Sequence, residues 1–387
     1  METRQRLAAL EALRFGAALA VVLWHHQHFA PAGRPADLLG QPGAALLRPV
    51  YLYGAMGVQF FWLLSGFVFF TRYLEPVADG VVGAWRFAVR RFSRLYPLHL
   101  LTLLIVIALQ QWVQAVGAAA RYHYRAGEEL IYPTPPQGLP DQLTMTSGWQ
   151  VRQTAFDYNG PIWSVSLELL AYLLFFLLAV TTFRWCRRTP GRRGVWFATL
   201  AVLAVSALVA VADDLPHVTL VECVALFLLG GVLTEVRRRA TPSHRTGLHL
   251  AAAATVGLAV AVLLGRDPAR GTDLLGGTRL LVVAAFAALI LSASLAPRVR
   301  RTGSLRRWAE RAGACTYGMY LLHVPLQLAV MAAFATWDRT VPAGSPLFLA
   351  AFLVALVLLA AWVHAHVEAP AQRWLRARLL RPSASAV

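Results

Sequence analysis

Residues 346–364 read PLFLAAFLVALVLLAAWVH, a stretch of 19 residues without Asp, Glu or Arg. A helix of about 20 apolar residues crosses the roughly 30 Å hydrocarbon core of a bilayer, because each residue adds about 1.5 Å. The stretch therefore predicts a membrane-spanning helix, and nine apolar runs of similar length precede it. The ten predicted spans are 8–29, 51–70, 96–116, 162–183, 195–211, 219–235, 248–264, 279–295, 315–334 and 346–364.

The composition of the whole chain supports the same class of protein. Of its 387 residues, 58% are apolar and 14% are charged, whereas a soluble domain is about half apolar and about a quarter charged. We therefore predict an all-α polytopic membrane protein. The polar segments between and after the spans are too short for a separate soluble core, so we expect one transmembrane domain over 1–370 and a short basic tail over 371–387.

The positive charge follows the predicted spans. All 36 basic residues are arginine and the net charge is +17, but the arginines lie between apolar runs and form no patch of their own, so we expect no nucleic-acid partner. Cytoplasmic loops are enriched in basic residues. With the N-terminus inside, cytoplasmic segments hold 26 arginines, the outer side holds nine including Arg279 at the outer end of its span, and Arg14 lies within the first span. This distribution predicts that both chain termini are cytoplasmic.

The first span carries polar side chains, which are costly in a bilayer and are therefore functional candidates. Arg14 and His25 are eleven residues apart, about three helical turns, so they share one face roughly 16 Å apart along the axis. Arg14 lies near the inner end and His25 near the outer end. Alternatively, Arg14 is a surface anchor paired with Glu11, and His25 is an interfacial histidine. A metal at His25 and His28 would need further ligands, and we predict no metal site.

Glu168 is the second polar candidate. It lies about 9 Å below the outer start of the fourth predicted span, at a depth similar to that of His25. A carboxylate beside an imidazole favours the imidazolium and orients the ring, which suits a general base. The alternative is a buried hydrogen bond between helices, from a Ser or Tyr hydroxyl to Glu168.

Arg91 and Arg94 precede the third span. They are three residues apart at the predicted mouth of a helix, so they can face the same way. Two guanidinium groups aimed together suit a diphosphate or phosphoadenosine group, because each offers a planar bidentate fork. The alternative is the ordinary positive charge of a cytoplasmic loop.

Two other spans carry weaker candidates. His323 lies near the midplane of the ninth span, three residues after Tyr320, and Pro325 is predicted to kink that helix and expose backbone carbonyls. Structural packing is an alternative role for Tyr320 and His323. In the second span, small and aromatic residues predict a close-packing surface. These residues are Gly57, Phe61, Ser65, Gly66 and Phe67.

Taken together, six segments resemble the acyltransferase-3 family of integral membrane acyltransferases. They are 10–14 (LEALR) with His25 eleven residues on, 60–67 (FFWLLSGF), 91–97 (RFSRLYP), 163–168 (WSVSLE), 317–323 (YGMYLLH) and 367–370 (VEAP). They run in the family's order over essentially the whole chain. Two departures are mild: Glu11 stands where the family usually has Asp, and Thr316 where it often has Ser. The chain resembles the stand-alone members, which lack a fused esterase-like domain.

The resemblance implies an O-acyltransferase of the bacterial cytoplasmic membrane, with no permanently bound cofactor. Its donor would be cytoplasmic acyl-CoA, such as acetyl-CoA, and its acceptor a hydroxyl of a cell-surface glycan or of a secreted metabolite such as a macrolide antibiotic. Arg14, Arg91 and Arg94 would hold the CoA phosphates. His25, oriented by Glu168, would deprotonate the acceptor hydroxyl or take the acyl group itself. The implied supporting residues are Tyr320, His323 and Ser65.

A transporter or flippase is the main alternative function. In that case the intramembrane His and Glu residues would relay protons and the arginines would bind an anionic substrate. A third alternative is a non-catalytic scaffold. Binding or hydrolysis of acetyl-CoA by the purified protein separates the enzyme from both.

Overall fold

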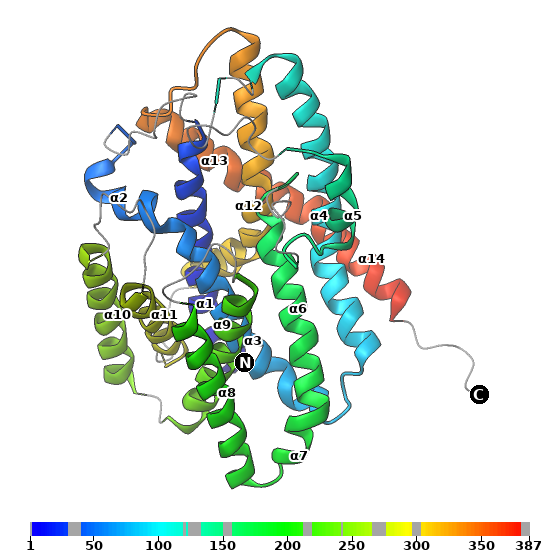
Figure 1. Cartoon of the computed structure of the whole chain (residues 1–387), viewed down its shortest axis with the longest axis vertical. Helices are drawn as coiled ribbons and strands as arrows, with labels where there is room; N and C mark the ends of the chain where they lie inside the picture. The colour runs from blue at the N-terminus through cyan, green and yellow to red at the C-terminus, as the bar shows by residue number, and fades with distance from the viewer. Residues whose placement is uncertain are drawn as a thin grey trace. The chain divides into compact units, whose positions relative to one another are not determined.

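The computed structural model describes residues 2–29, 40–118, 121–122, 133–149, 157–211, 219–240, 243–264, 276–295 and 303–380. Within these ranges the chain is built of helices and contains no β-strand, which confirms the predicted all-α class. The helices, drawn in Figure 1, are α1 (Glu2–His25), η1 (His26–Phe29), α2 (Ala44–Tyr53), η2 (Gly54–Met56), α3 (Gly57–Ala78), α4 (Ala84–Ala115), η4 (Pro136–Gly138), α5 (Leu139–Thr144), α6 (Ile162–Leu178), η6 (Ala179–Phe183), α7 (Arg184–Cys186), α8 (Pro190–Ala210), α9 (Thr219–Arg239), α10 (His244–Leu264), α11 (Gly276–Leu295), α12 (Gly303–Thr336), α13 (Pro346–Val363), η7 (His364–Glu368) and α14 (Ala369–Leu379).

Eight helices among the described residues are long and apolar enough to cross a membrane. They correspond to eight of the predicted spans, and α1 and α9 occupy the two other predicted runs. The chain is thus a polytopic membrane protein, and the total of ten spans stays a prediction. Two helices extend well beyond their apolar runs: α4 begins at Ala84 rather than near 96, and α12 at Gly303 rather than near 315. Ala and Arg are good helix formers, so both helices extend beyond the apolar residues that the bilayer core requires.

The chain divides into two compact units that are described separately below. The first unit comprises Met1–Val21, Leu52–Val82 and Leu167–Gly313, and the second comprises Val22–Tyr51, Gly83–Ser166 and Ala314–Val387. Helices α1, α2, α6 and α12 each contribute residues to both units.

In the first unit, α3 and α9 pack with their backbones in contact. A Cβ atom added to Gly66 would lie 1.9 Å from the carbonyl oxygen of Phe227, and one added to Gly230 would lie 2.1 Å from that of Leu63. A Cβ atom on Gly57 would lie 2.7 Å from the carbonyl oxygen of Ala17 on α1. Small residues permit this close approach between membrane helices. The close packing predicted for the second span is therefore confirmed at Gly57 and Gly66.

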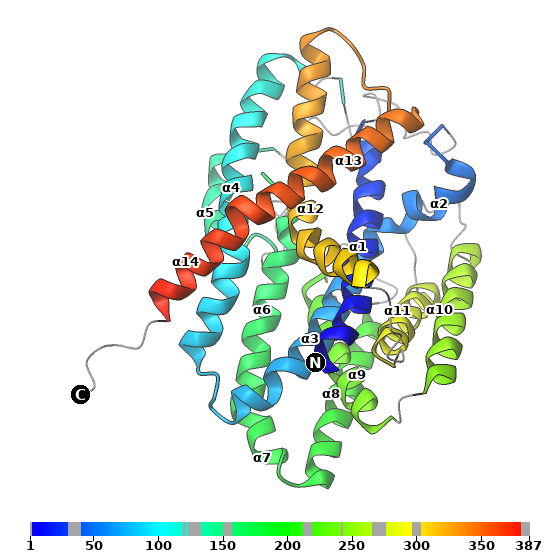
Figure 2. The ribbon, with the colours of Figure 1, turned by 180° about the vertical axis from the view of Figure 1, so that it is seen from behind.

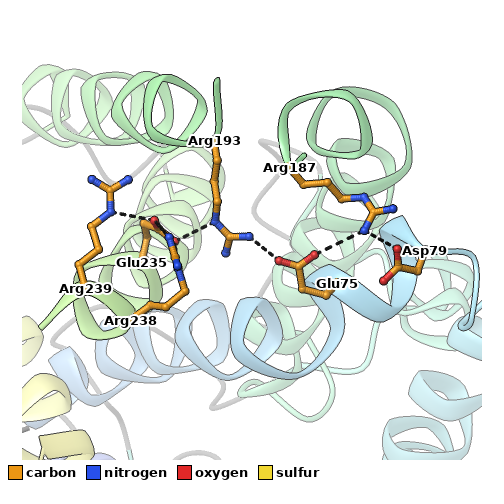
Figure 3. Close-up of polar contacts among 7 residues, drawn as sticks. All are labelled: Glu75, Asp79, Arg187, Arg193, Glu235, Arg238 and Arg239. Carbon is orange, nitrogen blue, oxygen red and sulfur yellow. Dashed lines mark hydrogen bonds and ion pairs between the residues drawn. The ribbon is translucent and has the colours of Figure 1, made fainter. Parts of the chain in front are cut away.

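A network of ion pairs joins the ends of α3, α7, α8 and α9 in the same unit. Arg193 lies between Glu75 and Glu235, with its Nε 3.1 Å from Glu235 Oε2, and it packs on two phenylalanine rings. Arg187 pairs with Asp79 and reaches Glu75. Figure 3 shows these pairs together with Arg238 and Arg239, which also bind Glu235. All these residues fall in or beside segments that the arginine distribution places in the cytoplasm, and within this unit they lie together.

In the second unit, the C-terminal helices form a nearly continuous rod. Helix α13, the π-helical turn η7 and α14 follow one another, and Figure 2 shows α14 crossing beside α4. The indole Nε1 of Trp85 donates to the carbonyl oxygen of Leu379 at 2.9 Å, and Arg376 Nε donates to Ser93 Oγ at 2.9 Å. The first part of the predicted basic tail is therefore a helix held against α4.

Candidate functional site

His25 ends α1 and belongs to a cluster of three histidines in the second unit. The centroid of its imidazole ring lies 4.9 Å from that of His28 and 4.7 Å from that of His323 on α12. The indole of Trp24 packs edge-on against the His25 ring, with centroids 4.7 Å apart. His28 and His323 are buried, and His25 is half-buried. The structure thus brings the predicted residues His25 and His323 together and adds His28.

The side-chain amide of Gln327 fixes the tautomer of His28. Its Nε2 donates to the backbone carbonyl of His25 at 2.8 Å, and its Oε1 lies 3.3 Å from His28 Nδ1. A carbonyl can only accept, so the NH₂ group must face His25 and the amide oxygen must face His28. His28 Nδ1 therefore carries the proton, which leaves Nε2 with a lone pair.

The tautomer of His323 follows from the same reasoning. Its Nδ1 lies 3.3 Å from the carbonyl oxygen of Met319, one turn earlier on α12, so Nδ1 is the donor and Nε2 the acceptor. His323 is fully buried, and its Nε2 has no hydrogen-bond partner among the described residues. A buried acceptor without a donor costs about 1–3 kcal/mol. His323 therefore places an unsatisfied acceptor close to the His25 ring.

Asn159 supplies a hydrogen bond that Pro325 removes from α12 near His323. Proline has no backbone N–H, so Pro325 leaves the carbonyl of Leu321 without its usual helical donor. The buried side chain of Asn159 supplies one instead, with Nδ2 3.1 Å from Leu321 O. The predicted exposure of a backbone carbonyl by Pro325 is thus observed, and a side chain compensates for it.

Tyr320 is tied to the same region. Its hydroxyl lies 2.7 Å from Ser164 Oγ, and Ser164 Oγ also donates to the carbonyl of Pro161 at 3.0 Å. Because a serine hydroxyl has a single proton, Tyr320 is the donor in its bond to Ser164. Its ring centroid lies 6.1 Å from that of His323. Tyr320 therefore anchors α12 to the start of α6, beside the histidine cluster.

Glu168 is described within the first unit. Its Oε1 accepts hydrogen bonds from the hydroxyls of Ser65 on α3 and Tyr172 on α6. The interhelical hydrogen bond that the sequence offered as an alternative role is therefore present, and its donor is Ser65. His25 belongs to the other unit, so its orientation by Glu168 stays a prediction.

The arginines predicted to bind CoA are held differently from one another. In the first unit, Arg14 Nη1 lies 3.1 Å from Glu11 Oε1, the pairing that the sequence offered as an alternative. In the second unit, Arg91 and Arg94 lie on α4. The prediction that they stand at the mouth of a helix is wrong, because α4 begins at Ala84, seven residues before Arg91. Arg91 is half-buried and Arg94 is exposed.

Three polar residues of the second unit were not predicted from the sequence: Gln327, Asn159 and Asp157. Gln327 lies one turn after His323 in an apolar helix, so a search for intramembrane amides as well as ionisable groups would have found it. Asn159 and Asp157 precede α6 in a polar stretch, and no local pattern marks them as buried. Among the described residues, no group of three or more His, Cys, Asp or Glu side chains could hold a metal ion.

Asp157 is a buried carboxylate outside the predicted spans. It is 5% exposed, and its Oδ2 has no hydrogen-bond partner among the described residues. Burial raises the pKa of Asp157 from 3.8 to about 6. A raised pKa means that the folded protein binds this proton more tightly than the unfolded chain, so the stabilisation is present at acid pH and is lost as the pH rises through about 6.

We expect Asp157→Asn to stabilise the protein at neutral pH and to have little effect in acid. Near pH 4 the wild-type carboxyl is protonated in the fold and resembles the amide. At pH 7.5 the wild type carries a buried charge that costs about 3 kcal/mol, from about two pKa units at about 1.4 kcal/mol each. The check is the thermal unfolding midpoint of both proteins in detergent at pH 4.5 and 7.5. An equal difference between the proteins at the two pH values would contradict this assignment.

Comparison with known proteins identifies the family. The family model described as "Acyltransferase domain", of the acyltransferase-3 family, matches residues 7–366. Acyltransferase MdmB of Streptomyces mycarofaciens is 34% identical over 222 residues, covering 54% of this chain and 48% of MdmB. Protein 2 in picA locus of Rhizobium radiobacter is 29% identical over 211 residues, covering 53% of this chain and 93% of that protein. The match thus spans about half the length of MdmB, and no solved structure matches. Because the family model covers nearly the whole sequence, the chain belongs to the acyltransferase-3 family.

Proposed function

We propose that the protein is a membrane-embedded O-acyltransferase that moves an acyl group, such as acetyl, from cytoplasmic acyl-CoA to a hydroxyl group. The observation that carries this proposal is the histidine cluster around His25, in a chain that belongs to an acyltransferase family. An imidazole is well suited to accept a proton near neutral pH. Both relatives named above are bacterial proteins, which supports a location in the bacterial cytoplasmic membrane.

The proposed reaction begins with proton transfer from the acceptor hydroxyl to His25. The hydroxyl oxygen attacks the thioester carbonyl, so a C–O bond forms and the C–S bond breaks. The CoA thiolate leaves and takes the proton from the imidazolium. The sequence predicts that Glu168 lies at a membrane depth similar to that of His25, and we propose that it favours the imidazolium form of His25. An acyl-histidine intermediate is the variant of this mechanism in which His25 itself takes the acyl group.

The proposed acceptor is a cell-surface polysaccharide or a secreted metabolite such as an antibiotic. Membership of the family and the likeness to MdmB, a protein named as an acyltransferase, support transfer of an acyl group. On the donor side, Arg91 and Arg94 on α4 are proposed to bind the CoA phosphates, with Arg14 as a third basic residue. The guanidinium fork suits phosphate oxygens.

The test of the proposal is direct binding of acetyl-CoA to the purified protein. We expect Arg91→Ala or Arg94→Ala to weaken binding about tenfold or more, because a hydrogen bond to a charged group contributes about 1.5–3 kcal/mol. Lysine at either position should restore binding only in part, since an ammonium group cannot reproduce the planar fork. The matched control is Arg192→Ala, which removes an exposed arginine of α8. Isothermal titration in detergent or lipid nanodiscs provides the measurement.

Two results would contradict the proposal at different levels. Equal affinity of the wild type, both alanine variants and the control would assign Arg91 and Arg94 to membrane topology alone. A wild-type protein that binds no acetyl-CoA and releases no thiol from it would argue against the enzyme and favour a transporter or flippase.

A further inference from the structure

We propose that His323 is a positioning residue that accepts a hydrogen bond from His25, which strengthens once His25 has taken the substrate proton. The proposal rests on the proposed function and assigns His323 a role in the same reaction. It follows from two observations. The tautomer of His323 is fixed, and its Nε2 is an acceptor without a donor that lies beside His25.

The rings of His25 and His323 lie close enough for a hydrogen bond between them. The ring centroids of His25 and His323 are 4.7 Å apart, and the ring planes are inclined by 57°. A nitrogen lies about 1.2 Å from the centre of an imidazole, so this separation accommodates an N–H···N hydrogen bond of about 2.9 Å after a small ring rotation. The Nδ1 of His323 donates to the carbonyl oxygen of Met319, so Nε2 is the nitrogen whose lone pair can accept such a bond.

The N–H groups of His25 change when it takes the hydroxyl proton. Neutral imidazole has one N–H, whereas imidazolium has two. The nitrogen of His25 that takes the hydroxyl proton also returns it to the CoA thiolate, so the N–H that can face His323 Nε2 is the one that the neutral ring already carries. This N–H becomes a stronger donor when His25 is positively charged, so its hydrogen bond to His323 strengthens as charge develops. An interaction that is stronger in the transition state than in the ground state raises kcat.

The hydrogen bonds around His323 fix its position. His323 is held by its own helix at Met319 O, and α12 is held by Asn159 at Leu321 O and by Ser164 at Tyr320. All these contacts are buried. An acceptor fixed in advance costs little reorganisation when the proton moves. His323 thus acts through His25 and needs no contact of its own with the substrates.

Two amide substitutions separate this role from a structural one. The amide group of His323→Gln reaches the place of Nε2 and keeps an acceptor beside His25. The amide of His323→Asn reaches the place of Nδ1 and keeps the donor to Met319 O. A purely structural histidine should therefore tolerate Asn at least as well as Gln, whereas the proposed role requires the opposite order. The matched control is His26→Gln, because His26 Nε2 bonds to the carbonyl of Ala343 at 2.9 Å, and a glutamine amide can donate there.

The measurement is thiol release from acetyl-CoA by the purified full-length protein, with acetyl-CoA affinity measured in parallel. We expect His323→Asn to lower kcat about 100-fold, a loss typical of removing one group that stabilises transition-state charge. His323→Gln should stay within about tenfold of the wild type, and neither variant should change acetyl-CoA affinity. The control should match the wild type.

Three outcomes would overturn the proposal. One is a kcat for His323→Asn that equals or exceeds that of His323→Gln. Another is a loss of acetyl-CoA affinity in both variants with kcat unchanged. A wild-type protein that binds acetyl-CoA but releases no thiol, even with the arginine variants showing weaker binding, would contradict the role of His323 and the chemistry of the proposed function while leaving donor binding established.

Discussion

His25→Ala is expected to abolish acyl transfer while acetyl-CoA binding is retained. A general base contributes about 10² to 10⁴ in rate, and alanine leaves no group that can accept the hydroxyl proton. Arg14 lies eleven residues, or about three helical turns, from His25 on α1. The substitution should therefore leave that basic group undisturbed.

Glu168→Gln is the companion variant for this prediction. The amide oxygen of Gln can still accept the hydroxyl protons of Ser65 and Tyr172, so the packing of α3 against α6 should persist while the charge is lost. We expect a smaller loss of rate than in His25→Ala. If the two residues act as a unit, the double variant should be little slower than His25→Ala alone.

Acyl transfer in membranes, with acetyl-CoA binding measured separately, provides the readout for all three proteins. Substantial activity in His25→Ala would return this histidine to an interfacial role and remove the basis of the mechanism. Additive losses in the double variant would show that Glu168 acts independently of His25 and serves the packing of the first unit.

The second large expected effect is the loss of folded protein through a steric clash. Gly66→Ala or Gly230→Ala should prevent α3 and α9 from packing, because each added methyl group would lie about 2 Å from a backbone carbonyl oxygen of the other helix. A backbone atom cannot move aside as a flexible side chain can. Overpacking in a core costs about 1–3 kcal/mol even where side chains can adjust, so the cost here should exceed that range and leave little folded protein.

Gly257→Ala on α10 is the matched control. A Cβ atom there meets Ala285 Cβ at 3.5 Å and Leu281 Cδ1 at 3.6 Å, which are ordinary contacts, and alanine favours the helix over glycine. The yield of monodisperse protein after detergent extraction and its thermal unfolding midpoint give the comparison. Wild-type yield and midpoint in Gly66→Ala would mean that α3 and α9 are not in backbone contact.

The fold was predictable from the sequence to the extent that the bilayer dictates it. Apolar runs such as 346–364 have to be helical, because only a helix satisfies every backbone group in hydrocarbon within a single segment. The ends of α4 and α12 were not predictable in this way, since their polar first turns lie outside the apolar runs. Likewise, the arginine distribution could count Arg187 and Arg193 as cytoplasmic charge, but it could not show that they bind Glu75 and Asp79.

The candidate site was predictable only residue by residue. The cost of burying polar groups in a bilayer singled out His25 and His323, and the structure places their rings together. The same reasoning considered His28 only as a partner of His25 in a metal site. Its role beside His25 depends on Gln327, which lies about 300 residues away in the chain. No local pattern encodes a contact of that range.

The bond between Asn159 and the Leu321 carbonyl has a consequence for how the protein is made. Chains emerge from the ribosome N-terminus first, so the segment that carries Asn159 is synthesised long before α12. When α12 enters the bilayer, Pro325 leaves it with a carbonyl that lipid cannot satisfy, and Asn159 is already present to bind it. The late helix is thereby guided onto an early segment of the chain, and an error in that segment should leave α12 exposed to the cell's membrane quality control.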